Sequence, residues 1–409
     1  MSDNSPITSI TAASLQPELW TSSSNDALQI YITDSDGTAL NFHPNFTYPI
    51  FGDSEQIFGY RDLVIFLCFD HCTFYPFLNV KYSDKLNDDT LEDPREKLLS
   101  YLPESTIFKD EVKWVDSINK EKEGFKIPGE LVGNIFTHGD DKFGIYKLDL
   151  KNAQGLELHK RLQILVLLFI EAGSYIDHQD ELWDIYVMYK VTDAKTPSII
   201  GFCTAYNYWK YGGFEKFDSN QQEVRKKISQ FIVLPMYQGL KLGGRFYNKL
   251  YEYWMQDPRV IEVVVEDPSE SFDDLRDRCD LTRLCQNTIK VVSVDLPLIN
   301  TEWATKLRQE QKLEKRQFSR LLEMILIYQL EHNLTNITKK QVRLFIKKRL
   351  YEKNKEILDG LDEPTRLDKL QTAYASLEQD YKRILSGLSL HKRALDSTEG
   401  SSKKSKPNV

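Results

Sequence analysis

The chain has 409 residues and a formal net charge of -8, with 41% hydrophobic and 28% charged residues. This length predicts two or three domains, and the composition is ordinary for a globular protein. The negative charge argues against direct nucleic-acid binding, which usually leaves a basic surface, and is compatible with a basic partner or substrate. Five cysteines, odd in number and without a CxxC pair, predict free thiols in a reducing compartment.

The sequence predicts no export segment, membrane span or metal site. The N-terminus has no basic segment followed by an apolar region, so we expect no signal peptide. The longest apolar stretch, Leu162 to Ile170, is far shorter than the ~20 residues that cross a bilayer, and it predicts a buried helix. The seven histidines are scattered, and none pairs with Glu or His at ligand spacing.

The first part of the chain predicts a mixed α/β domain over residues 1–135. Its first forty residues are rich in Ser, Thr, Asn and Asp, so we expect a loosely ordered start. Two β-rich runs then predict strands at Leu28–Thr33 and Asp62–Phe69. The turn-rich loop between them carries two carboxylates framed by aromatic residues. Residues 83–126 are polar and predict a helix and a long connection.

The middle of the chain, residues 136–300, predicts a second mixed domain. Strand and helix patterns follow one another as strand, helix, three strands, helix and strand: Phe143–Leu148, Gly155–Glu171, Trp183–Val191, Ile199–Tyr208, Ile228–Leu234, Gly243–Trp254 and Val260–Glu266. Residues 301–395 are charged and helical, which predicts a packed helical domain without chemistry of its own. The Ser/Lys-rich tail, residues 396–409, predicts disorder.

A strand that runs into a glycine-bearing turn and then a helix is the segment with the clearest chemistry. Backbone N–H groups in such a turn, and the positive end of the helix, suit a pyrophosphate. An open strand end would pair with an amide-rich ligand chain. Three glycines before a helix also occur as a plain turn, and the pattern alone leaves both interpretations open. The residues concerned are Phe231, Ile232, Val233, Gln238, Gly239, Leu240, Lys241, Leu242, Gly243 and Gly244.

The run Ser229–Leu284 resembles motif A of the GCN5-related N-acetyltransferases, Q/R-x-x-G-x-G/A, and more specifically the catalytic subunits of fungal type B histone acetyltransferases. Val265–Asp277 is its most specific part, and similarity extends to Phe46–Asp53, Leu168–Ala172 and Asp380–Arg383. The resemblance covers most of the chain. It implies an α+β protein with a central acetyltransferase fold around a mixed sheet. It also implies acetyl-coenzyme A (acetyl-CoA) as the cofactor, held by the residues above and by Ser269.

One residue departs from motif A. Lys241 occupies the position usually held by the first glycine. If that position needs a positive φ, a lysine there is strained by about 1 kcal/mol. If it needs only an N–H group, the ammonium favours the phosphate. Lys241 is also the sole support for an alternative in which the chain is a catalytically weak histone-binding scaffold.

Acetyl transfer to a lysine, whose pKa is near 10.4, requires a general base. Glu266 ends an apolar strand beside the predicted turn, where burial would raise its pKa toward the working range. From the residues alone, such a carboxylate also fits a cap or an ion-pair partner. The resemblance places Glu266, Asp267 and Glu171 near the acceptor amine. It also implies substrate contacts in which carboxylates attract a basic tail and aromatic rings cover the aliphatic stems of its side chains. The residues concerned are Asp53, Ser54, Glu55, Trp183, Tyr206, Asn207 and Tyr208.

A Gly-Gly-bearing loop carries four large rings: Trp209, Tyr211, Phe214 and Phe217. Such rings either fold back onto the domain's own core or dock a partner. The resemblance implies a WD-repeat histone-binding subunit as that partner, the tail of newly made histone H4 as substrate before chromatin assembly, and a location in cytoplasm and nucleus. Basic pairs at Lys392–Arg393 and Lys403–Lys404 resemble a nuclear import signal. An enzyme of the same fold with another acceptor is the remaining alternative.

Overall fold

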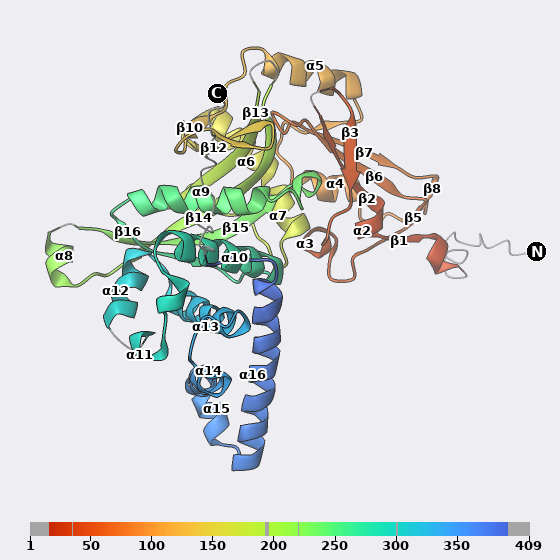
Figure 1. The fold of residues 1–409 in the computed structure, drawn as a ribbon. Helices are drawn as coiled ribbons and strands as arrows, with labels where there is room; N and C mark the ends of the chain where they lie inside the picture. Colours follow the sequence, from red (N-terminus) through yellow and green to blue (C-terminus); the bar gives the residue numbers. More distant parts are fainter. Residues whose placement is uncertain (1–15, 35, 193–195, 220, 300–301, 392–409) are drawn as a thin grey trace, which may run out of the picture. The chain divides into compact units, whose positions relative to one another are not determined.

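The computed structural model describes residues 16–34, 36–192, 196–219, 221–299 and 302–391 (Figure 1). Contacts divide the chain into two compact units. The first contains Met1–Val260 with Val264–Asp267, and the second contains Ile261–Val263 with Pro268–Val409. The predicted limits at residues 135 and 300 stay predictions. The basic tail and residues 1–15 lie outside the described residues.

A five-stranded mixed sheet opens the first unit, in the order β3-β2-β6-β7-β9. Its strands are β2 (Leu28–Thr33), β3 (Ala39–Phe42), β6 (Val64–Phe69), β7 (Pro76–Lys81) and β9 (Ile107–Phe108). Every second residue of β2 is buried, which is the period that predicted this strand. Around the sheet lie β1 (Thr21–Ser23) paired with β4 (Gln56–Phe58), β5 (Tyr60–Arg61) paired with β8 (Asp84–Lys85), and the helices α2 (Ser24–Ala27), α3 (Tyr48–Phe51), α4 (Pro94–Leu99) and α5 (Glu111–Lys122). The first described element is η1 (Pro17–Leu19), and the loosely ordered start that the sequence predicts stays a prediction for residues 1–15, which lie outside the described residues.

A seven-stranded sheet forms the rest of the first unit, in the order β10-β12-β13-β14-β15-β16, with β11 also paired to β12. The strands are β10 (Gly129–Leu131), β11 (Phe136–His138), β12 (Asp141–Leu148), β13 (Trp183–Val191), β14 (Ser198–Lys210), β15 (Glu223–Val233) and β16 (Val260–Val265). Val224 N bonds to Arg259 O and Glu266 N to Ile228 O, so β16 runs parallel to β15. The other neighbours are antiparallel, so the predicted mixed sheet is confirmed.

Helices cover both faces of this sheet. On one face, α6 (Ala153–Leu162) and α7 (Ile164–Phe169) share a single apolar core with β2, β6 and β13. The sequence predicted one helix here, but Gln163 ends α6 and starts α7. On the other face lies α9 (Leu242–Gln256), where Phe246 packs on Phe231 with ring centroids 5.0 Å apart. The predicted substrate and cofactor residues therefore fall in the first unit, except Ser269, which lies in the second.

The second unit is helical, as predicted. It contains α10 (Glu270–Asn287), η3 (Val291–Ser293), α11 (Leu296–Ile299), α12 (Glu302–Glu310), α13 (Lys315–Glu331), α14 (Lys339–Lys353), α15 (Lys355–Asp359) and α16 (Glu363–Leu385). The apolar face of α13, including Leu321, Leu322 and Ile325, is buried. Such a stripe at helical spacing is what a packed helix requires.

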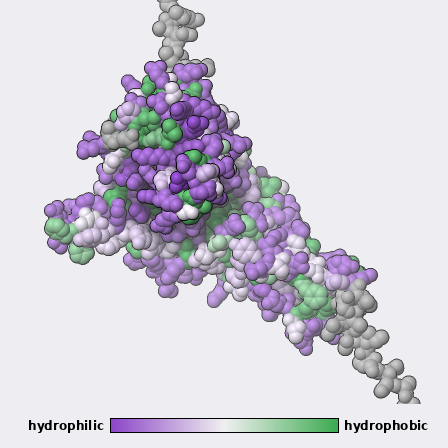
Figure 2. Space-filling model, turned by 90° about the horizontal axis from the view of Figure 1, so that it is seen from below, coloured by the Kyte–Doolittle hydropathy of each residue, from purple (hydrophilic) through white to green (hydrophobic). Residues whose placement is uncertain are grey.

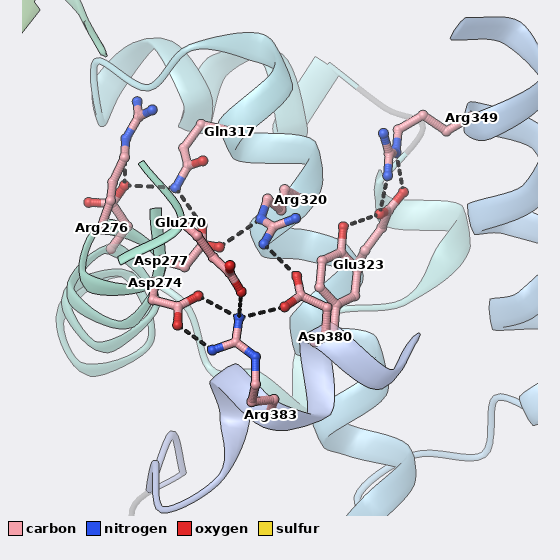
Figure 3. A network of polar contacts seen from close by, with 12 residues as sticks. Glu270, Asp274, Arg276, Asp277, Gln317, Arg320, Glu323, Arg349, Asp380 and Arg383 are labelled. Carbon is pink, nitrogen blue, oxygen red and sulfur yellow. Dashed lines mark hydrogen bonds and ion pairs between the residues drawn. The ribbon is translucent and has the colours of Figure 1, made fainter. Parts of the chain in front are cut away.

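A polar network joins α10, α13 and α16 of the second unit (Figure 3). Arg383 reaches Asp274 on α10 and, at 2.6 Å, Asp380 on its own helix. Arg320 on α13 bonds to Asp277 at 2.6 Å and to Asp380 at 3.1 Å. Two arginines thus share Asp380 and hold three helices together. Asp380 and Arg383, at the two ends of the segment that resembles the family, therefore have a structural role in this chain.

Candidate active site

A β-bulge in β15 shapes the site. Gln230 lies opposite Thr204, and Ile228 lies opposite Ala205, so Ser229 has no residue opposite it. A bulge leaves its extra residue outside the ladder and bends the strand. Here the bulge redirects the side chains of β15 beside the end of β16. The two strands meet at this point, since Glu266 N donates to Ile228 O at 2.9 Å.

Four side chains form a row across the sheet. Trp183 on β13 lies opposite Tyr206 on β14, and Tyr206 lies opposite Lys227 on β15. The rings of Trp183 and Tyr206 meet edge to face, with centroids 4.8 Å apart. Lys227 Nζ lies 6.0 Å from the Tyr206 centroid and 2.5 Å from Glu266 Oε1. We call Trp183, Tyr206, Lys227 and Glu266 the acceptor row.

Glu266 is held as an ionised carboxylate. Lys227 binds one of its oxygens, and Ser229 Oγ donates to the other at 2.7 Å. Burial raises the pKa of Glu266, but the bonds from Lys227 and Ser229 outweigh it and keep the pKa below its ordinary value. The expected rise toward neutrality is therefore wrong for the free protein. The reason is that the side chain is 40% exposed and has a cation beside it.

Hydrogen bonds connect the bulged strand β15 to the loop that carries Glu171, and connect that loop to Tyr48. Gln230 Nε2, one residue past the bulge, donates to Ser174 O at 2.8 Å. In the same loop, Ala172 N donates to the hydroxyl of Tyr48 at 2.5 Å. Glu171, the neighbour of Ala172, is exposed, as is Asp267, which follows Glu266. The structure thus ties the loop of Glu171 to the bulged strand.

Glu55 has an internal role in the N-terminal loop. Its carboxylate accepts from Thr47 N at 2.6 Å, Tyr48 N at 3.1 Å and Asn25 Nδ2 at 2.8 Å. The Thr47 bond is the largest cause that lowers the pKa of Glu55. These bonds hold the loop in its conformation, in which the backbone of Glu55 itself has a positive φ of 49°. The neighbouring predicted substrate residues, Asp53 and Ser54, are exposed.

Asn207 and Tyr208 follow the row but differ in their surroundings. Asn207 Nδ2 donates to Asp184 at 3.0 Å, and Lys226 Nζ donates to Asn207 Oδ1 at 2.7 Å. Because side chains alternate along a strand, this cluster lies on the face opposite Tyr206. Tyr208 is 54% exposed. The structure therefore brings Tyr206, but not the Asn207 side chain, to the row.

The turn before α9 has the features of an anion site. Gln238 Nε2 donates to Val233 O at 2.8 Å, and His138 Nε2 donates to Leu240 O at 2.8 Å, which fixes the turn. Gly239 has a φ of +75°. Lys241 precedes α9 in the left-handed region, with φ 61° and ψ 10°, and its side chain caps no N–H group.

The start of α9 contrasts with other helices of the chain. An Asp, Asn, Ser or Thr side chain caps each of α5, α6, α10, α14 and α16. At α9 an exposed cation, Lys241, stands in that place, and two residues of the first turn, Gly243 and Gly244, have no Cβ atom. A helix N-terminus without a side-chain cap, flanked by cations, is suited to a phosphate group. These residues fit the diphosphate of acetyl-CoA.

At the end of β15, backbone N–H and C=O groups, and not side chains, are the groups that could bind a ligand. Ile232 is buried in the core, and its carbonyl oxygen faces Gly201 of β14. The N–H and C=O of Phe231 and Val233 therefore point to the other edge, beyond the end of β16. An extended, amide-rich chain fits such an edge. Ser269, also predicted to bind cofactor, accepts from Phe272 N at 3.3 Å as the cap of α10.

The four predicted docking rings are exposed. Trp209 lies at the end of β14, Tyr211 in the loop that follows, and Phe214 and Phe217 in α8 (Phe214–Asp218). The accessible fractions are 49% for Trp209, 57% for Tyr211, 68% for Phe214 and 63% for Phe217. The Trp209, Tyr211 and Phe217 centroids are 6.1–6.4 Å apart. Figure 2 shows apolar surface where this hairpin projects. The alternative that the rings fold back onto the domain's own core is therefore excluded.

Two family models match the chain. "Histone acetyl transferase HAT1 N-terminus" matches residues 20–171, and "Fungal HAT1, C-terminal" matches residues 277–331. A histone acetyltransferase type B catalytic subunit of Debaryomyces hansenii is 99% identical over 409 residues, which is 100% of both chains. Those of Candida albicans and Kluyveromyces lactis are 59% and 48% identical, covering 98% and 96% of this chain and 98% and 99% of their own.

The chain belongs to the family of histone acetyltransferase type B catalytic subunits. Membership confirms the resemblance seen in the sequence and makes the chain an acetyltransferase. The type B family model over residues 20–171 includes both Glu55 and Glu171, whose loops the structure ties to β15. Sequence reasoning missed Lys227 and Ser229. Lys227 could have been found by aligning the three strands with one another, which pairs Trp183 with Tyr206 and Tyr206 with Lys227.

Two further properties concern the described residues of this type B family member. Its described helices include none with the length and apolar composition that a bilayer crossing requires. Among the same residues, His, Cys, Asp and Glu side chains form no group of three with a geometry that could hold a metal ion.

Proposed function

We propose that this acetyltransferase transfers acetyl groups from acetyl-CoA to lysine side chains in the N-terminal tail of newly synthesised histone H4, before chromatin assembly. The acceptor row supports this function. It offers two rings that would cover the aliphatic stem of a lysine, and it ends at a carboxylate that would receive the proton of the ammonium. The net charge of -8 favours a basic tail.

Glu266 is the general base of the proposed reaction. Ser229 orients one carboxylate oxygen, and the other accepts the proton once the acceptor lysine replaces Lys227. A peptide that covers the site removes water, and this desolvation raises the pKa of Glu266 toward that of a working base. Asp267 and Glu171 add negative charge that attracts the ammonium.

When bound, acetyl-CoA supplies an acyl group already activated as a thioester. The residues of this chain bind and orient it. The start of α9, with Lys241 and Arg245, would hold the diphosphate, and the outer edge of Phe231 to Val233 would pair with the amide-rich arm. A backbone N–H of the bulged strand would polarise the thioester carbonyl. No covalent enzyme intermediate is required.

The exposed rings of Trp209, Tyr211, Phe214 and Phe217 support a docking surface for a WD-repeat histone-binding subunit. Clustered aromatic side chains are typical interface anchors. The rings continue from Tyr206 along β14, so a partner bound there would present a histone tail close to the acceptor row. We place the enzyme in cytoplasm and nucleus, where newly made histones pass.

Mass spectrometry of histone H4 tail peptides after incubation with enzyme and acetyl-CoA tests the function. We expect acetylated lysines, with polyamines modified much more slowly in competition. Preferred modification of polyamines would favour an enzyme with a small-molecule acceptor. Calorimetry that detects no acetyl-CoA binding at micromolar concentrations would favour the histone-binding scaffold.

A further inference from the structure

Lys227 lies where an acceptor lysine must lie to give its proton to Glu266. Its Nζ is 2.5 Å from the carboxylate and 6.0 Å from the Tyr206 centroid. The Lys227 side chain is 29% exposed and that of Glu266 is 40% exposed, so solvent and ligands reach both. These contacts are the same ones that the proposed function gives to a histone lysine.

We propose that Lys227 is itself an acetyl acceptor: with acetyl-CoA bound and no histone tail present, the enzyme acetylates the Nζ of Lys227. The proposal rests on the proposed function, because it uses Glu266 as base and acetyl-CoA as donor. Lys227 thereby becomes a self-modification site within the acceptor row.

The reaction balances without an oxidant or reductant. Glu266 takes one proton from the Lys227 ammonium, and the nitrogen lone pair forms a bond to the thioester carbonyl carbon. The carbon–sulfur bond then breaks, and the departing sulfur takes the proton that the nitrogen loses as the amide forms. The products are Nζ-acetyl-lysine and free coenzyme A.

The position of Lys227 along β15 brings its amine toward the proposed donor site. Two residues of an extended strand span about 6.6 Å, and Ser229, two residues on, is the bulge beyond which the strand offers its outer edge. The adjacent Lys226 lies on the opposite face, buried against Asp184. Lys227 therefore has the base beside it and lies on the same strand as the donor edge, which begins four residues further on at Phe231.

Acetylation of Lys227 changes the site that it occupies. The acetylated side chain is neutral and releases Glu266 Oε1, which a histone lysine then binds. Loss of the cation also removes an influence that keeps the pKa of Glu266 low, so the effect of burial prevails. A self-acetylated enzyme is consequently better prepared for its substrate than the free protein.

Lys249 provides a matched control. It is 37% exposed and pairs with Glu252 at 2.6 Å, so it also carries a carboxylate beside its ammonium. It lies on α9, away from the acceptor row. Chemical acetylation without catalysis should treat Lys249 and Lys227 alike, whereas catalysis by the site should favour Lys227.

The test uses the full-length protein, deacetylated beforehand and incubated with acetyl-CoA that carries a ¹³C-labelled acetyl group, without peptide. Peptide mapping by mass spectrometry should show the label on Lys227 at about tenfold or more above Lys249, as expected for general-base catalysis. Glu266→Gln, with its fold checked by circular dichroism, should reduce Lys227 labelling to the level of Lys249. Lys227→Arg should remove the signal from this peptide.

A parallel reaction with a histone H4 tail peptide separates the two proposals. Labelled peptide with Lys227 labelled no more than Lys249 would overturn self-acetylation and leave the proposed function standing. Equal labelling of Lys227 in wild type and Glu266→Gln would also overturn it. If neither peptide nor Lys227 is labelled, the proposed function fails and self-acetylation fails with it.

Discussion

A buried ion cluster at the base of the β14–β15 hairpin should control the stability of the first unit. Asp184 binds Lys226 through one oxygen and Lys147 through the other, the latter at 2.7 Å. The Lys226 side chain is 4% exposed, and Asn207 completes the cluster. Asp184→Asn keeps the shape of the side chain but leaves a buried ammonium without a counter-charge.

The size of the effect follows from burial. Breaking one buried ion pair by removing a partner costs about 3–5 kcal/mol. The Lys147 bond adds little, because that side chain is 39% exposed and solvated. We therefore expect Asp184→Asn to lower the free energy of unfolding by about 3–5 kcal/mol. Lys226→Met should cost less, about 1–2 kcal/mol, because Asp184 keeps Lys147 and Asn207.

Urea unfolding followed by tryptophan fluorescence measures both variants. Burial raises the pKa of Asp184, but Lys226 and Lys147 outweigh it and hold the pKa below the ordinary 3.8. A carboxylate with a lowered folded pKa stabilises the protein above its unfolded pKa and loses that contribution as pH falls below it. The deficit of Asp184→Asn should therefore be full at pH 7 and shrink below about pH 4. A loss under about 1 kcal/mol at pH 7, or a larger loss for Lys226→Met, would refute the reasoning.

Four further changes test the site and the fold. Glu266→Gln should lower kcat for a histone peptide by roughly 10²–10⁴-fold with little change in acetyl-CoA affinity; activity within threefold of wild type, roughly, would exclude Glu266 as the base. Gly243→Val should weaken acetyl-CoA binding, measured by calorimetry, by about tenfold or more, because a β-branched side chain crowds the first turn of α9. Trp209→Ala with Phe214→Ala should weaken propeller binding by about 2 kcal/mol while a free peptide is still acetylated; normal binding by the folded variant would place the docking surface elsewhere. Burial lowers the pKa of His159 from 6.5 to about 4. The buried neutral ring therefore stabilises the protein fully above pH 6.5, and the free energy of unfolding falls by about 3 kcal/mol as the pH is lowered toward 4. In urea titrations, His159→Leu should not show this loss.

The sequence predicted the limits of strands whose apolar residues alternate regularly. It did not predict the limits of a strand whose charged residues form ion pairs with other strands. β13 has the predicted limits, Trp183–Val191. β15 begins five residues before the predicted Ile228, at Glu223. Its first half contains Lys226 and Lys227, whose charges hide the strand pattern. The structure places these cations on opposite faces, each paired with a carboxylate, and such long-range pairing is not visible in a local pattern.

The candidate site shows the same division. Glu266 was predictable because it ends an apolar strand inside a specific motif. Ser229 was not, because its role depends on a bulge that only the pairing of β14 with β15 defines. The resemblance grouped Asn207 with Tyr206 as a substrate contact, although adjacent strand residues face opposite sides. A period-two reading of the segment would have separated them.

The backbone conformation of Lys241, the unusual residue of motif A, bears on its effect on cofactor binding. Lys241 has a φ of +61°, so it bears a left-handed strain of about 1 kcal/mol. That strain is already present in the free protein, so it lowers the stability of the turn and does not lower the free energy released when a cofactor binds. The ammonium itself is exposed beside the first turn of α9, where it attracts a phosphate. Lys241 therefore gives no physical support to a scaffold that has lost its cofactor, and the same residue favours an anionic ligand at this turn.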